Sequence, residues 1–174
     1  VVGAFHGLSR DRAEARKYPS IDPLDSWSKY PTVVNPERAD YARQLLREGN
    51  EVGQMMKVVG EEGTSTEDYI LYMKSEFLDA VYLQQNAFDP VDAAVSAERQ
   101  RHVFGVMFDI LTSKLEIKSK DEVRGFFNSL RQKFLDYNGA EWNSDDFQSL
   151  ENEIKSMVEE KSVGVEHNAQ HLLE

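Results

Sequence analysis

The chain has 174 residues, 40% of them hydrophobic, with no cysteine and a formal net charge of −11. The lack of cysteine excludes disulfides and cysteine-based zinc sites, and the negative charge argues against nucleic acid as a partner. No apolar run reaches the roughly 18 residues of a membrane span, and no secretory leader is evident. We therefore expect a cytoplasmic protein with a real core and no direct membrane insertion.

The N-terminal part is expected to be extended. Its first stretch, VVGAFHGLS, lacks an initiating Met and predicts a short strand over residues 1–8, which would need pairing partners from a larger protein. The segment RKYPSIDPLDSWSKYP follows and holds three of the five prolines. A residue that precedes proline is restricted to extended geometry, so Tyr18, Asp22 and Tyr30 are expected outside any helix.

The first long helix is predicted to begin at Asn35, the N-cap, with Pro36 at the first helical position. Gly49 and Gly53 are expected to weaken this helix locally. The apolar positions recur at helical spacing and predict one buried face, which comprises Tyr41, Leu45, Val52, Met55, Met56 and Val59.

A turn over residues 60–68, GEEGTSTED, leads into a second helix, for which either Thr64 or Ser65 can act as the N-cap. The short connection predicts that the two helices form an antiparallel hairpin. The second helix is expected to bury one stripe of residues, namely Ile70, Met73, Phe77 and Val81. Pro90 is expected to end it.

The rest of the chain predicts further amphipathic helices, and so a mainly α fold, a helical bundle with a short N-terminal strand or extended segment. Ser144 is the expected cap of the last helix. Residues 162–174 show weak periodicity and predict a loose tail or a poorly packed last turn. The expected buried faces are, in chain order, Val103, Val106, Met107, Ile110, Leu111 and Leu115; then Val123, Phe126, Phe127, Leu130, Phe134 and Tyr137; then Phe147, Leu150, Ile154, Met157 and Val158.

The sequence contains none of the common motifs for nucleotide binding, metal-dependent proteolysis or serine hydrolase activity. The phosphate-binding loop GxxxxGK[ST] and the patterns GxGxxG, HExxH and GxSxG do not occur. Glu98 with His102, and His167 with His171, have the spacing of one helix face, but two ligands are too few for a metal site, and we interpret them as solvated. The acidic residues fit polar helix faces. No catalytic and no metal-binding residue is expected.

Two segments suggest more than packing. Tyr18 is held by the proline that follows it, and Phe88 ends the polar stretch QQNA between two helices. A rigidly held aromatic ring loses little entropy when a planar ligand stacks on it, so two such loops could form a slot for a purine. Tyr18 and Phe88 could instead fill the core, and the residues alone favour this second interpretation.

Both segments resemble the catalytic subunits of rotary ATPases. KYPSIDPLDSWSKY is similar to the adenine-side loop of those subunits, with the F-type Asp-Pro-Leu-Asp-Ser run and the V-type Ser-Lys-Tyr end. LQQNAF matches a motif of the V-type and archaeal-type A subunit, with Tyr82 in place of its leading Phe. The resemblance covers roughly residues 1–115 in order and spacing.

The resemblance implies an adenine pocket and two domains. Tyr18 would stack on adenine, Phe88 would be the second aromatic of the pocket, and its rim would be formed by Gln85, Asn86 and Ala87. Residues 1–34 would be the tail end of the nucleotide-binding domain, and residues 35–174 the C-terminal helical domain. ATP or ADP with Mg²⁺ would bind the intact subunit. This segment alone lacks the phosphate-binding loop, so it should bind neither and should be inactive.

The resemblance also implies a mechanical role in ATP synthesis or hydrolysis coupled to proton or sodium transport. The turn would face the central rotor stalk, through Glu61, Glu62, Gly63, Thr64 and Ser65. Its charge is diluted relative to F-type subunits, which favours a steric lever over an electrostatic one. The other expected partner is the B subunit of the alternating ring, in a peripheral, cytoplasmic part of a membrane-bound complex.

Two alternatives stay open at this stage. The chain could be a stand-alone helical interaction module, although such a module has no reason to carry the strand expected over residues 1–8. It could also be a small helical enzyme, which would need carboxylates that converge on an apolar face.

Overall fold

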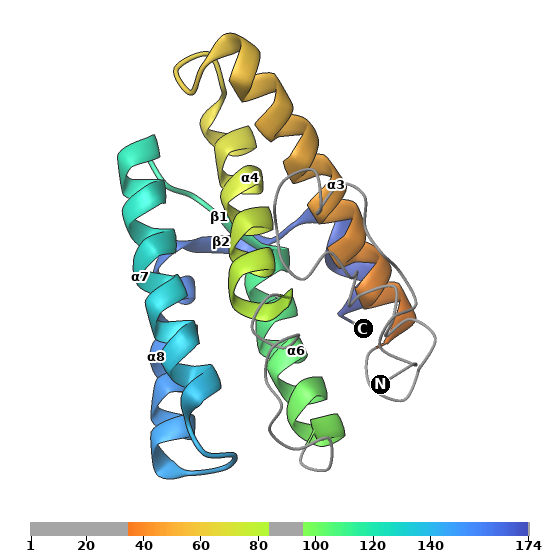
Figure 1. Ribbon diagram of the computed structural model, residues 1–174, viewed down its shortest axis with the longest axis vertical. Helices are drawn as coiled ribbons and strands as arrows, with labels where there is room; N and C mark the ends of the chain where they lie inside the picture. The colour runs from red at the N-terminus through yellow and green to blue at the C-terminus, as the bar shows by residue number, and fades with distance from the viewer. Residues whose placement is uncertain (1–34, 84–95, 174) are drawn as a thin grey trace.

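The computed structural model of the chain describes residues 35–83 and 96–173. These residues form a helical bundle with a small antiparallel sheet (Figure 1). The long helices are α3 (Pro36–Val59), α4 (Thr66–Leu78), α6 (Ser96–Thr112), α7 (Lys120–Gly139) and α8 (Asp145–Lys161). The short elements are the π-helix η2 (Asp79–Leu83), the strands β1 (Ser113–Leu115) and β2 (Ser162–Val165), and the 3-10 helix η3 (His167–Leu172). The predicted mainly α class is confirmed.

Two of the expected helix starts are confirmed by their hydrogen bonds. The side chain of Asn35 accepts a hydrogen bond from the backbone N–H of Glu37 at 2.9 Å, and Pro36 begins α3. The hydroxyl of Ser144 accepts from the N–H of Phe147 at 3.1 Å. Each cap satisfies a backbone donor that the first turn of a helix leaves without a partner.

Helices α3 and α4 form the predicted antiparallel hairpin (Figure 1). They approach closely at Gly49, where an added Cβ atom would lie 2.2 Å from the Cβ of Ser75. Since only glycine fits this position, the residue expected to weaken α3 is the one that allows the two helices to meet. On α4 and η2, the predicted residues Ile70, Phe77 and Val81 are buried and Met73 is half-buried.

Helix α6 is buried on more sides than the sequence predicts. The expected face from Val103 to Leu111 is confirmed, but Phe104 and Phe108 are buried as well. Leu115, expected on the same helix, lies in β1, because α6 ends at Thr112. Because the buried surface of α6 is wider than one apolar stripe, the periodicity of its sequence understates its burial.

Helices α7 and α8 pack on each other and complete the core with aromatic rings. Phe134 and Tyr137 of α7 and Phe147 of α8 are fully buried, and the rings of Tyr137 and Phe147 stack at 4.4 Å between centroids. Phe77 of α4 meets the edge of Phe134 at 5.5 Å. The predicted faces of both helices are confirmed, with Phe126, Leu150 and Met157 half-buried at their margins.

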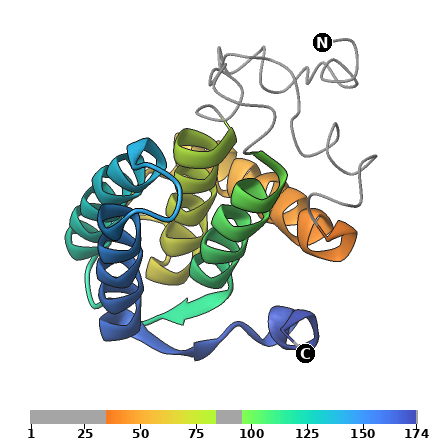
Figure 2. The same cartoon turned by 90° about the horizontal axis from the view of Figure 1, so that it is seen from below.

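The prediction of a loose tail is wrong. Residues 162–172, here called the C-terminal strap, form β2 and η3 and run from α8 towards α3 (Figure 2). Strand β2 pairs antiparallel with β1, with Ser113 opposite Val165 and Leu115 opposite Ser162. Ala169 in η3 is fully buried. Strands this short leave no periodic signal, and their pairing depends on a segment far away in the sequence.

Candidate functional site

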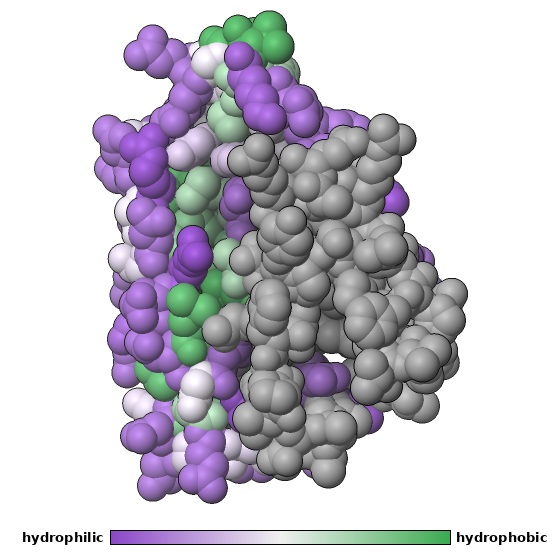
Figure 3. Space-filling view, in the orientation of Figure 1, coloured by the Kyte–Doolittle hydropathy of each residue, from purple (hydrophilic) through white to green (hydrophobic). Residues whose placement is uncertain are grey.

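The end of α3 carries an exposed apolar surface, here called the apolar tip. Met55 is 40% exposed, Val58 86% and Val59 51%. A hydrophobic cluster is visible at this end of the molecule, at the top of Figure 3. The predicted burial of Met55 and Val59 is therefore wrong, because the last turns of α3 extend beyond the helices that would cover them.

Two of the five residues predicted to face the rotor form hydrogen bonds within the hairpin. Thr64 is buried, and its hydroxyl donates to the carbonyl of Gly60 at 3.1 Å. Ser65 is the N-cap of α4 and accepts from the N–H of Asp68 at 3.1 Å, so Thr64 is not the cap. These bonds fix the turn. The exposed surface at this end belongs to the apolar tip and to the remaining turn residues, Glu61, Glu62 and Gly63.

The turn is also tied to α7. The carboxylate of Glu61 pairs with Arg124, and its backbone carbonyl accepts from Nζ of Lys120 at 2.5 Å. A half-exposed ion pair is individually weak. Together, the ion pair and the hydrogen bond to the backbone connect the turn of the hairpin to the start of α7.

At the opposite end of the hairpin, the described residues border the ranges 1–34 and 84–95, which hold the residues predicted to bind nucleotide. Because α3 and α4 are antiparallel, Pro36 and Leu83 lie at the same end, away from the turn. Tyr18 and residues 85–88 lie outside the described residues, and their roles stay predictions. Helix α3 has 24 residues, and at about 1.5 Å per residue it is about 36 Å long.

A buried carboxylate joins α6, α7 and α8. Glu151 Oε2 lies 2.7 Å from Nε2 of His102 and accepts from the hydroxyl of Tyr137 at 3.1 Å, while Oε1 accepts from Nζ of Lys155 at 2.5 Å. Burial raises the pKa of Glu151, but the hydrogen bonds from His102 and Lys155 outweigh it and lower the pKa below its ordinary value.

The cluster corrects the interpretation that the acidic residues lie on polar helix faces. Glu151 does not lie on a polar face: it follows Phe147 by four residues and precedes Ile154 by three, which places it on the apolar stripe of α8. That spacing is the signal that could have found it. His102, predicted from the sequence to be solvated, has a side chain that is 44% exposed and also pairs with Glu151. No group of three or more His, Asp or Glu residues within 35–83 and 96–173 is arranged to hold a metal ion.

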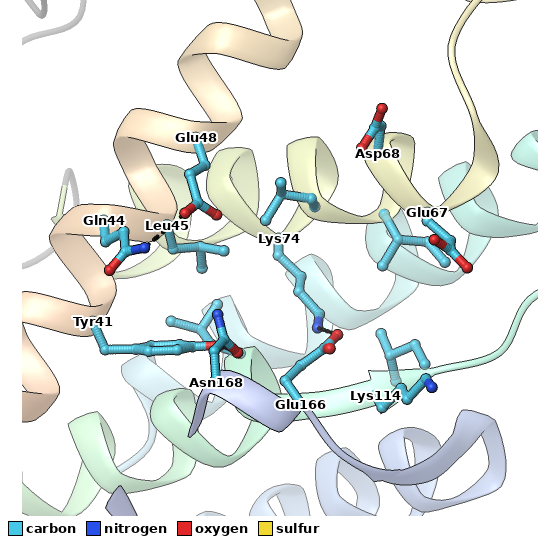
Figure 4. A pocket seen from close by; sticks show the side chains of 14 residues that line it. Tyr41, Gln44, Leu45, Glu48, Glu67, Asp68, Lys74, Lys114, Glu166 and Asn168 are labelled. Carbon is cyan, nitrogen blue, oxygen red and sulfur yellow. Dashed lines mark hydrogen bonds and ion pairs between the residues drawn. The ribbon is translucent and has the colours of Figure 1, made fainter. Parts of the chain in front are cut away.

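A hollow of about 400 Å³ lies between α3, α4, β1 and the C-terminal strap (Figure 4). Lys74 extends across it from α4 and contacts Glu166 in the strap. Tyr41 lines the hollow, and burial, with the nearby Glu166 and Glu48 carboxylates, raises its pKa to about 12. The phenol therefore stays neutral and donates to Asn168 Oδ1 at 3.5 Å.

The described residues thus define a mainly helical domain whose main feature is a long hairpin with an exposed apolar tip. None of the helices in this part of the chain is both long and apolar enough to cross a membrane. The chain belongs to the family described as the C-terminal domain of V and A type ATP synthase, which matches residues 35–124.

Its relatives carry consistent names. The chain is 57% identical over 173 residues to the V-type ATP synthase alpha chain of Treponema denticola, and 50% identical to alpha chain 1 of Treponema pallidum; each match covers 99% of this chain and 29% of the relative. It is 55% identical over 163 residues to the alpha chain of Borrelia turicatae, which covers 94% of this chain and 28% of the relative. The chain thus spans less than a third of the length of the relatives that it matches.

Proposed function

We propose that this chain is the C-terminal part of the A subunit, or alpha chain, of a V-type ATP synthase. It supplies residues to an adenine pocket and a helical lever that couples ATP hydrolysis or synthesis to rotation and to proton or sodium transport. One observation supports this proposal: Pro36 and Leu83, which border the ranges that hold Tyr18 and Phe88 in the sequence, lie at one end of the α3–α4 hairpin, and the apolar tip lies at the other.

At the adenine end, Tyr18 and Phe88 stack on the base, and Gln85, Asn86 and Ala87 line the rim. Mg²⁺ and the phosphates of ATP or ADP are held by other parts of the intact subunit, because this chain has no phosphate-binding loop. The neighbouring B subunit contacts the same region. The chain thus packs the base and leaves the chemistry to its surroundings.

At the other end, the turn and the apolar tip press on the central rotor stalk. Val58 and Val59 are better suited to this contact than Thr64 and Ser65, whose side chains are used within the turn. Exposed apolar side chains of this kind gain free energy when a partner covers them. The contact is therefore steric and apolar, as the diluted charge of the turn suggests.

In the full-length subunit, Tyr18→Ala or Phe88→Ala is expected to raise the Kd for ATP about 2- to 13-fold, since one aromatic stacking contact contributes about 0.5–1.5 kcal/mol. Isothermal titration calorimetry measures this directly. Phe126→Ala, which truncates a half-buried ring on α7, is the control and should leave Kd unchanged. Binding as tight as that of the wild type in both variants would show that the pocket is wrongly assigned.

The double variant Val58→Asp, Val59→Asp is expected to keep ATP binding but to reduce the number of ions transported per ATP hydrolysed in the assembled complex. Two carboxylates would have to lose water at a contact that is now apolar. The ratio is measured on reconstituted vesicles by following phosphate release and ion uptake together. The matched control is Asn152→Asp, Ser156→Asp, which adds the same charge at two exposed positions of α8, outside the apolar tip and the strap. A wild-type ratio in the double variant would refute the lever.

A further inference from the structure

A single lysine connects three elements of the domain. Lys74 lies on α4 and is 2% exposed. Its Nζ atom donates to the backbone carbonyl of Ser113 in β1 at 2.7 Å and to Oε1 of Glu166 in the strap at 3.2 Å. Figure 4 shows the side chain reaching across the hollow to Glu166.

Stability alone does not account for a charge at this position. Burial disfavours the ammonium group and lowers the pKa of Lys74, although the carboxylate of Glu166 opposes this shift. Apolar residues that replace a buried ion pair are often neutral or stabilising. An apolar residue cannot form directional hydrogen bonds. The two hydrogen bonds of Lys74 fix where β1 and the strap lie relative to α4.

The strap is fastened to α3 as well. Nη2 of Arg38 donates to the carbonyl of Leu172 at 3.3 Å, and the Tyr41 hydroxyl contacts Asn168. Ala169 is fully buried beside these bonds. The strap thus connects the C-terminal end of α8 to both helices of the hairpin (Figure 2).

We propose that Lys74 is a positioning residue that fastens the α3–α4 hairpin to the C-terminal strap, so that the hairpin and the rest of the bundle move as one body. This inference rests on the proposed lever function. If the α3–α4 hairpin were held only at its base, a force on the apolar tip would rotate the hairpin alone. Because the hairpin is also held along its side, the same force displaces α6, α7 and α8 with it.

The test is Lys74→Met in the full-length subunit of the assembled complex, with Lys133→Met as the control. Lys133 is a half-exposed lysine that also pairs with a glutamate, Glu153. In Lys74→Met, amide hydrogen exchange over residues 162–172 is expected to be about tenfold faster, as for the loss of a charge-assisted hydrogen bond. The ions transported per ATP should fall while the KM for ATP stays unchanged. The control should alter neither readout.

Glu166→Gln guards against a folding defect, because Glu166 is partly exposed and the amide still accepts a hydrogen bond. It should shift both readouts in the same direction and by less. Wild-type exchange in the strap of Lys74→Met would overturn the inference. The inference would also be overturned if Lys74→Met showed faster exchange but an unchanged number of ions transported per ATP, in an assay where V58D/V59D lowers that number. If V58D/V59D also leaves the ratio unchanged, the lever function itself fails and takes this inference with it.

Discussion

Replacement of Phe134 by alanine is expected to lower the free energy of unfolding by about 3–5 kcal/mol, the usual cost of truncating a fully buried phenylalanine. Phe134 has no exposed surface, and its ring contacts Phe77 of α4 at 5.5 Å and Tyr137 at 5.3 Å between centroids. The cavity would lie where the hairpin meets α7, so both neighbours would lose contacts. Urea denaturation followed by far-UV circular dichroism measures the change.

Phe126→Ala is the control for this variant. It truncates a ring of the same size on the same helix, but Phe126 is only half-buried at the margin of the core. Part of the space that it leaves can be filled by water, so its cost should be clearly smaller. Equal losses in the two variants would mean that the junction between α4 and α7 is not packed as described.

Glu151→Ala is expected to cost about 1–3 kcal/mol, because it leaves the buried hydroxyl of Tyr137 without an acceptor. The hydroxyl of Tyr137 would have no partner within the core, and His102 and Lys155 would lose their carboxylate. The measurement is again urea denaturation at neutral pH. Glu153→Ala, which removes an exposed partner of Lys133 on the same helix, is the control and should cost far less.

The same carboxylate predicts a pH dependence. The folded chain holds the pKa of Glu151 below its ordinary value of 4.5, so the folded state binds fewer protons at this group than the unfolded state does. The resulting stabilisation is complete above pH 4.5 and is lost as the pH falls through the lower folded pKa. Between pH 6 and pH 3, the wild type should therefore lose more stability than Glu151→Gln. Parallel curves for the two proteins would contradict this assignment.

The local features of the fold could be predicted from the sequence. The caps Asn35 and Ser144, the apolar faces of α7 and α8 and the hairpin all depend on residues a few positions apart, and the structure confirms them. The strap could not be predicted, because the pairing of β1 with β2 depends on segments that are distant in the sequence. For the same reason, Lys74 gave no sign that it would be buried against Glu166.

The candidate site could be predicted only in part. The sequence located the turn between α3 and α4, but not that Thr64 is buried within it, because that depends on how the turn folds back on Gly60. Periodicity placed Met55 and Val59 on a buried face, since it registers which side of a helix is apolar and not how far its neighbours extend. Tyr18 and residues 85–88 rest on resemblance and stay predictions.

The close approach of α3 to α4 at Gly49 bears on how the hairpin carries load. Two rods that slide freely along each other bend as two thin rods, whereas two rods pinned together bend as one thicker beam. The side chain of Ser75 fills the notch left by the missing Cβ atom of Gly49 and opposes such sliding. The lack of a side chain at Gly49 therefore lets the two helices pack closely enough to resist bending together.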